Sequence, residues 1–271
     1  MHTLKPKVLI IGAQGFIGSF LSRNLSYDYD VYKIVKGSLD VLDLDVVYNF
    51  LKQNKFDIVV NCLTFGGKHQ VNVIDETIVS DNLKLFNNFL LNSDKFSHFI
   101  NIGSGSEFDT SKNITDAKEF EIFDSSPKQS YSYSKNIIAR TIFTNNKFTT
   151  LRLFGCFGQH EPEIRLLKKY TKNGTVSIVD RYFDFISIED FTKIIEFVLK
   201  NSLTSFDMNC VYQEKIKLST FLQTYDKCLN RNSNFAINEL SQLNYTGNSN
   251  KLSSLQLNLF GLEDSFKKFY G

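Results

Sequence analysis

The sequence predicts an α/β fold, a doubly wound parallel sheet with helices on both faces, followed by a small C-terminal α/β part. Two observations predict it. Short apolar runs rich in β-branched residues, typical of strands buried on both faces, alternate with segments of helical periodicity, beginning at Val8. The first elements read strand, helix, strand, helix, strand, which is the order of right-handed parallel crossovers. The chain has 271 residues, 42% hydrophobic and 22% charged, enough for one large or two closely joined domains.

The predicted elements of the N-terminal half follow in chain order. Continuous apolar runs predict strands over residues 8–11, 31–35, 57–61, 98–102 and 148–154. Apolar residues spaced three and four apart predict helices over residues 16–25, 43–54, 74–91 and 130–144. Residues 109–129 are polar, and we predict a surface loop with some structure there.

The C-terminal half alternates less regularly. The same patterns predict helices over residues 164–170, 188–199 and 218–228, and strands over residues 176–179 and 207–211. Residues 230–250 are rich in Asn and Ser, and their pattern predicts no element. Because no Pro-rich linker interrupts the chain, we predict two closely packed domains, residues 1–155 and 156–271, with the chain crossing between them.

Composition and charge exclude several function classes. The net charge of +2, from 31 basic and 29 acidic residues, gives no general attraction to nucleic acid or to an anionic membrane. No apolar stretch reaches the ~18–20 residues of a membrane span, and no secretory signal precedes the first strand, so we expect a cytoplasmic protein. The cysteines form no CxxC pair, so we expect free thiols and no metal site; they are Cys62, Cys156, Cys210 and Cys228.

A glycine-rich turn joins the first strand to the first helix, with the spacing GxxGxxG. Gly12 permits a tight turn, Gly15 lets the backbone approach a pyrophosphate, and Gly18 lets helix and strand pack closely. The helix N-terminus offers free N–H groups to phosphates. This context predicts a Rossmann-type dinucleotide site in residues 1–155, although a structural turn without a ligand has the same spacing. The predicted cofactor contacts are Gly12, Gln14, Gly15, Phe16, Ile17 and Gly18.

The end of the second strand bears on the choice of cofactor. NAD sites usually place Asp or Glu there to bind the ribose 2′-hydroxyl. Residues 34–38 carry no acid, and Lys36 or Ser38 can receive a 2′-phosphate instead. We therefore expect NADP(H) in preference to NAD(H), with a merely solvated Lys36 as the alternative.

A serine, a tyrosine and a lysine form the candidate catalytic set. Tyr131 and Lys135 lie one turn apart on a predicted helix, so that the ammonium favours the phenolate and lowers the tyrosine pKa. Such a tyrosine can exchange a proton with a carbonyl oxygen near neutral pH. Ser104 follows the fourth strand, where ligands bind in open α/β sheets, and its hydroxyl can hold the reacting oxygen or simply cap a turn. The GxSxG spacing of serine hydrolases is absent.

Together these residues resemble the extended short-chain dehydrogenase/reductase superfamily, in its NAD-dependent epimerase/dehydratase (nucleotide-sugar) branch. The resemblance covers about residues 8–199 and includes Leu151-Arg152-Leu153-Phe154 and Asp184-Phe185-Ile186-Ser187-Ile188-Glu189-Asp190. It implies a cofactor on the N-terminal domain and a nucleoside-diphosphate sugar mostly on the C-terminal part. The further cofactor contacts that it implies are Asp40, Val41, Cys62, Leu63, Thr64, Asn82, Tyr131 and Lys135.

Three activities of this branch compete. The Thr-Asp-Glu run of dehydratases is absent at Ser104, and the acid that holds NAD in 4-epimerases is absent after the second strand. The 4-keto-6-deoxysugar reductases, of the GDP-fucose synthase and dTDP-4-dehydrorhamnose reductase type, remain. Ser106 replaces the cysteine that assists epimerisation in GDP-fucose synthase, so we do not expect epimerisation. His160 is either an acid/base group or a loop residue.

The resemblance implies hydride transfer from NADPH to the C4 ketone of a nucleotide-linked 4-keto-6-deoxy sugar. Tyr131 would donate the proton, Lys135 would lower its pKa and hold the nicotinamide ribose, and Ser104 would bind the reacting oxygen. The alternatives are an epimerase or dehydratase of the same branch and a non-catalytic protein that senses the nucleotide. Gly155 and Phe183 depart from the Asn and Arg that often contact substrate in the family. Family members often pair through the helix with Tyr and Lys, so a homodimer is a further expectation.

Overall fold

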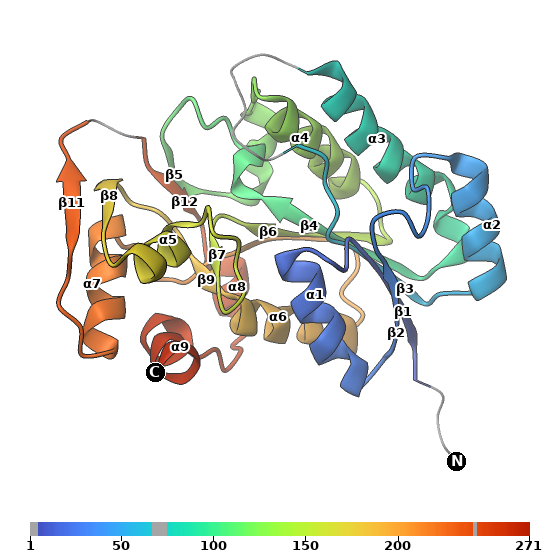
Figure 1. Cartoon of the computed structure of the whole chain (residues 1–271). Helices are drawn as coiled ribbons and strands as arrows, with labels where there is room; N and C mark the ends of the chain where they lie inside the picture. The colour runs from blue at the N-terminus through green and yellow to red at the C-terminus, as the bar shows by residue number, and fades with distance from the viewer. Residues whose placement is uncertain (1–4, 67–74, 241–242) are drawn as a thin grey trace. The chain divides into compact units, whose positions relative to one another are not determined.

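A six-stranded sheet, counted over the part of the chain that the structure describes, has the order β10-β6-β4-β3-β1-β2 (Figure 1). The structure is a computed structural model, and it describes residues 5–66, 75–240 and 243–271. β1 pairs in parallel with β2 and β3, and β3 pairs in parallel with β4. The predicted α/β class with a parallel sheet is therefore confirmed. The strands are β1 (Lys7–Ile11), β2 (Asp30–Ile34), β3 (Ile58–Asn61), β4 (His98–Ser104), β6 (Phe148–Leu153) and β10 (Phe206–Cys210).

The chain divides into two compact units. The first comprises Met1–Asp109, Glu121–Arg152 and Glu196–Asp207, and the second comprises Thr110–Phe120, Leu153–Ile195 and Met208–Gly271. No helix of the described residues is both long and apolar enough to cross a membrane.

Three helices of the first unit begin within one residue of their predicted starts, and the predicted start at residue 74 lies outside the described residues. The helices of this unit are α1 (Phe16–Asn24), α2 (Leu44–Asn54), α3 (Glu76–Leu91) and α4 (Ser130–Phe143), with the 3₁₀ turns η1 (Leu25–Tyr27), η2 (Ser93–Lys95), η3 (Gly105–Glu107) and η4 (Glu119–Asp124). Asp43 and Asp75 cap α2 and α3, because each side chain accepts hydrogen bonds from backbone N–H groups of the first turn.

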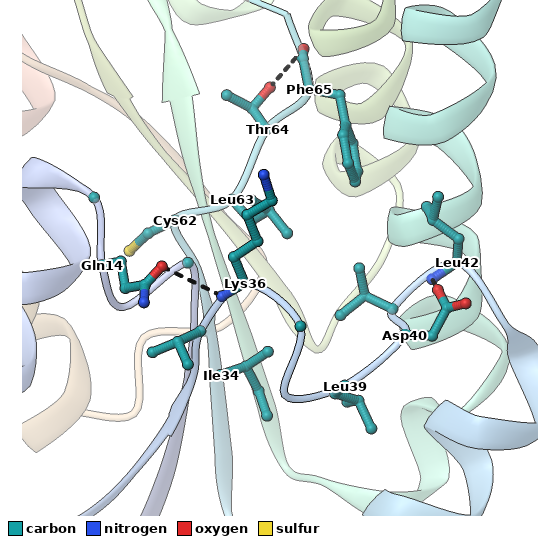
Figure 2. Close-up of a pocket in the computed structure, with 15 residues that line it drawn as sticks. Gln14, Ile34, Lys36, Leu39, Asp40, Leu42, Cys62, Leu63, Thr64 and Phe65 are labelled. Carbon is teal, nitrogen blue, oxygen red and sulfur yellow. Dashed lines mark hydrogen bonds between the residues drawn. The ribbon is translucent and has the colours of Figure 1, made fainter.

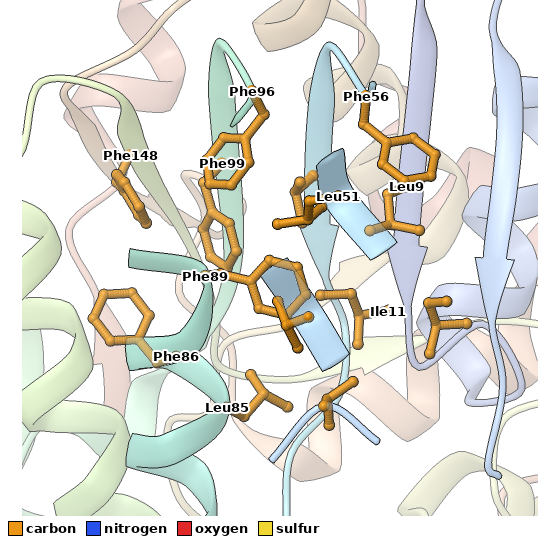
Figure 3. Close-up of a cluster of buried hydrophobic side chains, with 14 of the residues drawn as sticks. Leu9, Ile11, Leu51, Phe56, Leu85, Phe86, Phe89, Phe96, Phe99 and Phe148 are labelled. Atoms are coloured by element: carbon orange, nitrogen blue, oxygen red, sulfur yellow. The ribbon is translucent and has the colours of Figure 1, made fainter. Parts of the chain in front are cut away.

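Phenylalanines fill the core between the sheet and the helices. Phe86 and Phe89 of α3 pack over Phe99 of β4, and Phe99 stacks on Phe148 of β6 with ring centroids 4.9 Å apart (Figure 3). Aromatic pairs of this kind add ~0.5–1.5 kcal/mol each beyond the area that they bury. The chain has 26 phenylalanines, and this core accounts for part of them.

The second unit is built from shorter strands around its own aromatic core, which includes Phe157, Phe221 and Phe266. Its small sheets pair β8 with β11, β5 with β12, and β7 with β9. Its strands are β5 (Ile114–Ala117), β7 (Cys156–Phe157), β8 (Val176–Val179), β9 (Ile186–Ser187), β11 (Phe235–Asn238) and β12 (Tyr245–Gly247). Its helices are α5 (Leu166–Asn173), α7 (Leu218–Cys228), α8 (Asn250–Ser254) and α9 (Gly261–Tyr270), and α6 (Ile188–Lys200) begins in it.

Residues 109–129, predicted as a surface loop with some structure, contain the strand β5 and the 3₁₀ turn η4. Strand β12 pairs in parallel with β5, so Tyr245 is the partner of Ile114. Strand β11, in the region without a predicted element, pairs in parallel with β8. Both strands are only three or four residues long, and distant segments stabilise them. No local pattern could therefore have predicted them.

Candidate active site

A pocket of about 830 Å³ opens beside the carboxyl ends of β1, β2 and β3 (Figure 2). The predicted cofactor residues in its wall are Gly12, Gln14, Gly15, Lys36, Asp40, Val41, Cys62, Leu63 and Thr64. The residues that the predicted contact set did not include are Ile34, Val35, Gly37, Leu39, Leu42 and Phe65. Most of these are apolar side chains next to predicted contacts, so the signal was the apolar character of the loops that follow β2 and β3.

The glycine turn shows which glycines the fold itself requires. Gly12 has a φ of +80°, and a Cβ there would lie 2.8 Å from the backbone nitrogen of Leu63. A Cβ on Gly18 would lie 2.3 Å from the carbonyl oxygen of Gly12. At Gly15 the nearest atom to a Cβ would be 3.4 Å away, so the protein alone does not exclude a side chain there. Gly15 is the N-cap of α1 and makes no side-chain cap, which leaves the N–H groups of the first turn to a ligand.

Six predicted contacts lie outside the wall of this pocket on the same unit: Phe16, Ile17, Gly18, Asn82, Tyr131 and Lys135. Asn82 is buried and forms hydrogen bonds with the loop after β3, which is part of the wall. Its Oδ1 accepts hydrogen bonds from the Phe65 backbone at 2.9 Å and from the Thr64 hydroxyl at 3.0 Å. Its Nδ2 donates to the Phe65 carbonyl at 2.9 Å. Asn82 therefore holds the loop after β3 in place.

In the turn after β2, the two residues predicted to bind a 2′-phosphate, Lys36 and Ser38, differ in whether their side chains are available. The Ser38 hydroxyl donates to the Val35 carbonyl at 2.8 Å and accepts from the Val35 amide at 3.0 Å, which commits it to the turn. The Lys36 side chain extends along the pocket (Figure 2). Its backbone amide lies 3.4 Å from Gln14 Oε1. Asp40 also lines the pocket, and its carboxylate accepts from the Leu42 amide at 3.0 Å.

Ser104 ends β4 and begins η3. Its hydroxyl accepts from the Ser106 amide at 3.2 Å and lies 2.9 Å from the Ser106 hydroxyl. The capping role considered for Ser104 is therefore present, and the hydroxyl is at the same time only half-buried at the end of a central strand. The Ser104 hydroxyl can therefore cap the turn and still form a hydrogen bond with the oxygen of a ligand.

Helix α4 places Tyr131 and Lys135 one turn apart. Lys135 is almost completely buried, and its Nζ donates to the Ile102 carbonyl of β4 at 2.9 Å. Ser104 and Lys135 thus meet the same end of β4. Burial lowers the pKa of Lys135, and the nearby Glu107 and Cys62 act in the opposite direction. Tyr131 is half-buried.

Cys62 lies in the wall of the same pocket, and its thiol is a poor nucleophile. Burial raises the pKa of its thiol to about 12, and the positive charge of Lys135 only partly offsets this. The thiol is therefore neutral at physiological pH. Among the described residues, no group of three or more His, Cys, Asp or Glu side chains is placed to hold a metal ion.

The acids of the segment Asp184–Asp190 stabilise the second unit. Asp184 accepts from Lys215 Nζ at 2.7 Å and from the Gly247 amide at 2.8 Å. Asp190 accepts from the amides of Phe260 and Gly261 at 2.8 and 2.9 Å and so holds the start of α9. These contacts are structural.

The second unit has a pocket of its own, of about 380 Å³, whose wall contains two arginines. Arg181 stacks its guanidinium over the Phe183 ring at 5.1 Å and donates to the Leu243 carbonyl at 3.1 Å. Its Nε is buried and has no hydrogen-bond partner among the described residues. Arg165 precedes α5 in the same wall. His160 is exposed, with a φ of +68°.

A protein-family model described as "NAD dependent epimerase/dehydratase family" matches residues 8–210. A search of curated protein sequences finds no match. Among solved structures, the dTDP-4-dehydrorhamnose reductase of Bacillus anthracis in complex with NADP is similar, with a TM-score of 0.82 and 17% identity. The comparison covers 100% of this chain and 99% of that one.

Two further structures are similar. A GDP-6-OMe-4-keto-L-xylo-heptose reductase from C. jejuni has a TM-score of 0.77 and 16% identity, over 98% of this chain and 97% of that one. A GDP-L-fucose synthetase from Naegleria fowleri bound to NADP has a TM-score of 0.75 and 17% identity, over 98% of this chain and 92% of that one. At such identities the likeness shows a shared fold.

Proposed function

The chain belongs to the NAD dependent epimerase/dehydratase family, and we propose that it is the NADPH-dependent reductase of a nucleotide-linked 4-keto-6-deoxy sugar. The family confirms the expectation of an enzyme that uses a nicotinamide dinucleotide. One observation carries the proposal of a ketone reductase: Ser104 and Lys135 both lie at the end of β4, and Tyr131 is one helical turn from Lys135. The unit that contains them also contains the pocket beside the glycine-rich turn. The similar structures named as reductases support it.

NADPH supplies the hydride when it is bound. Tyr131 donates a proton to the ketone oxygen as negative charge develops on it, so that the product carries a hydroxyl group. The positive charge of Lys135 lies next to the phenol. It therefore stabilises the phenolate that remains when Tyr131 gives up its proton. The Ser104 hydroxyl binds the same oxygen and aligns it for Tyr131. The assembly needs no further acid or base for a ketone reduction.

The state of Glu107 favours reduction over elimination of water. Elimination requires an acid and a base that reach the substrate, and Glu107 is the carboxylate of the turn that carries Ser104. Its side chain is fully buried and forms an ion pair with Arg152 at 2.6 Å. It is therefore withdrawn from any substrate that contacts Ser104.

NADPH is proposed over NADH because of the turn after β2. That turn has no acid for a ribose 2′-hydroxyl, and Lys36 lies in the pocket wall where it can meet a 2′-phosphate. The NADP in two of the similar structures agrees with this choice.

The substrate diphosphate is proposed to bind in the pocket of the second unit. Arg165 and Arg181 place two guanidinium groups in one wall, and guanidinium forks bind phosphate oxygens well. The buried Arg181 Nε still has a proton to donate. Arg181 would thereby take over the contact that is lost where Phe183 replaces the usual arginine.

The test is absorbance at the reduced-nicotinamide band with NADPH or NADH and a panel of nucleotide-linked 4-keto-6-deoxy sugars. Consumption of NADPH with one of them supports the proposal. Cofactor binding without consumption would instead indicate a redox-neutral enzyme of the family or a nucleotide sensor. Tyr131→Phe should lower turnover by ~10²–10⁴-fold and leave NADPH affinity nearly unchanged. Full activity of this variant would rule out Tyr131 as the proton donor.

A further inference from the structure

Three charged side chains, Glu107, Arg152 and Asp207, are buried together next to the turn that carries Ser104. Arg152 Nε donates to Glu107 Oε2 at 2.6 Å, and Arg152 Nη2 lies 3.1 Å from Asp207 Oδ1. Glu107 and Arg152 are fully buried, and Asp207 is 6% exposed. Buried ion pairs rarely stabilise a fold more than apolar residues of the same volume would, so stability alone does not account for this triad.

The second oxygen of Glu107 contacts the candidate catalytic strand end. Glu107 Oε1 accepts a hydrogen bond from the Ser104 amide at 2.9 Å. Lys135 Nζ donates to the Ile102 carbonyl at 2.9 Å. Glu107 and Lys135 therefore bind the two peptide groups that flank Gly103, one on each.

Gly103 has no room for a side chain between these contacts. A Cβ there would lie 2.7 Å from Glu107 Oε1 and 2.7 Å from Thr150 Cγ2. The carboxylate is thus packed directly against the backbone of β4. Arg152, which holds the other oxygen, prevents it from turning away. The Ser104 amide, the Gly103 backbone and Arg152 together fix the position of the Glu107 carboxylate.

The titratable groups around Lys135 come from separate elements. Glu107 faces it from η3, Cys62 follows β3, and Tyr131 precedes it on α4. Burial lowers the pKa of Lys135, and the negative charge of Glu107 is the largest influence that raises it again. Because Cys62 stays neutral up to a pH of about 12, Glu107 is the anion that matters at physiological pH. Burial also raises the pKa of Glu107, whereas the ion pair with Arg152 and the hydrogen bond from the Ser104 amide favour its charged form.

We propose that Glu107 is a positioning residue for the Ser104, Tyr131 and Lys135 site, which fixes the backbone at Ser104 and supplies the negative charge that keeps Lys135 protonated. The inference rests on the proposed function for the identity of the catalytic residues. Glu107 does not touch the substrate. Its effect reaches the reaction through the position of the Ser104 hydroxyl and the charge of Lys135.

The experiment measures the Lys135 pKa directly, without substrate. In the Tyr131→Phe background Lys135 titrates without its phenol neighbour, and its ¹³Cε signal in lysine-labelled protein is assigned by Lys135→Arg. Glu107→Gln should lower the Lys135 pKa by roughly one unit, because it removes the nearby anion. Asp207→Asn is the matched control: it also removes a buried charge of the triad but should leave the Lys135 pKa in place. Equal Lys135 pKa values in all three proteins would overturn the proposal.

A second variant covers the case in which Glu107→Gln does not fold, as judged by circular dichroism. Glu107→Asp keeps the charge but shortens the side chain, so the Ser104 amide should exchange its proton ~10-fold faster with solvent. Unchanged exchange at Ser104 would also overturn the proposal. The titration and the exchange need no turnover, so failure of the reductase assay with the unmodified chain remains a separate result.

Discussion

The pockets of the two units are built in different ways. The pocket of the first unit is lined by the turns that follow β1, β2 and β3, and its wall is largely apolar with Lys36 as its cation. The pocket of the second unit takes its wall from β8 and from the starts of α5 and α7, and it holds two arginines. The first is built from three short segments, each next to a strand that the local sequence predicts. The second exists only once distant short segments are brought together.

The strongest effects are expected in the glycine turn, where two substitutions separate fold from binding. Gly18→Ala should lower both the thermal unfolding midpoint and the NADPH affinity, since its Cβ would overlap the Gly12 carbonyl. Gly15→Ala should fold normally but lose ~100-fold or more in NADPH affinity, because a methyl group keeps the pyrophosphate from the backbone. Fluorescence titration with NADPH and a thermal melt check both. Normal NADPH binding by Gly15→Ala would contradict the site.

Arg181 tests the pocket of the second unit. Arg181→Gln removes a charged hydrogen-bond donor of ~1.5–3 kcal/mol, so the KM for the nucleotide sugar should rise by ~10–100-fold while the NADPH affinity stays the same. Lys172→Gln, an exposed change on α5, is the control and should alter neither. If the KM is unchanged in Arg181→Gln, the diphosphate binds elsewhere.

A substitution at Lys36 tests the proposed preference for NADPH over NADH. Lys36→Gln should weaken NADPH binding by ~10-fold and leave NADH binding unchanged, because only NADPH carries the 2′-phosphate. Parallel titrations with the two cofactors measure the ratio. Ser38→Ala is the control, since that hydroxyl is used by the turn itself. An equal loss of affinity for NADPH and NADH would show that Lys36 stabilises the pocket and does not bind the 2′-phosphate.

The smallest effect is a pH dependence of stability in the second unit. Burial raises the pKa of Glu161 to about 7, above its usual value, with Arg165 acting against the rise. Since the folded state then binds more protons than the unfolded state between about pH 4.5 and 7, the free energy of unfolding should increase as the pH falls through 7. The melting midpoint should rise by a few degrees from pH 8 to 6. Glu161→Gln should flatten this slope in part, because Glu189 has a pKa of about 7 for the same reason.

Much of the first unit followed from local pattern. The run from Val8 to Ile11 is fully buried, as its continuous apolar character indicates, and α2 begins after Asp43, a residue that caps helices well. The second unit followed less well. The helix at Leu218–Cys228 has its predicted bounds, whereas β7 and β9 are two residues each and exist through pairing with one another. Such strands carry too few residues to form a periodic signal.

The candidate site divides in the same way. Ser104, Tyr131 and Lys135 were selected by spacing, and Lys135 does meet the strand that Ser104 ends. Spacing could not show which residues face inward. In the folded chain, Asn82 accepts a hydrogen bond from the Phe65 backbone, and the Ser38 hydroxyl donates one to the Val35 carbonyl. Both side chains therefore bind backbone groups, which spacing in the sequence could not predict.

By itself, the sequence determined the parallel α/β class, the glycine turn and the family, because these depend on periodicity and on residues close together in the chain. Only the tertiary structure decided the roles of the acids. Glu107 is four residues after Gly103, yet its burial against Arg152 and Asp207 makes it a support rather than a reactive group. Asp190 holds the start of α9, a helix 70 residues further on. The charge state and partners of a carboxylate depend on its burial and on what packs against it, and both arise from contacts across the fold.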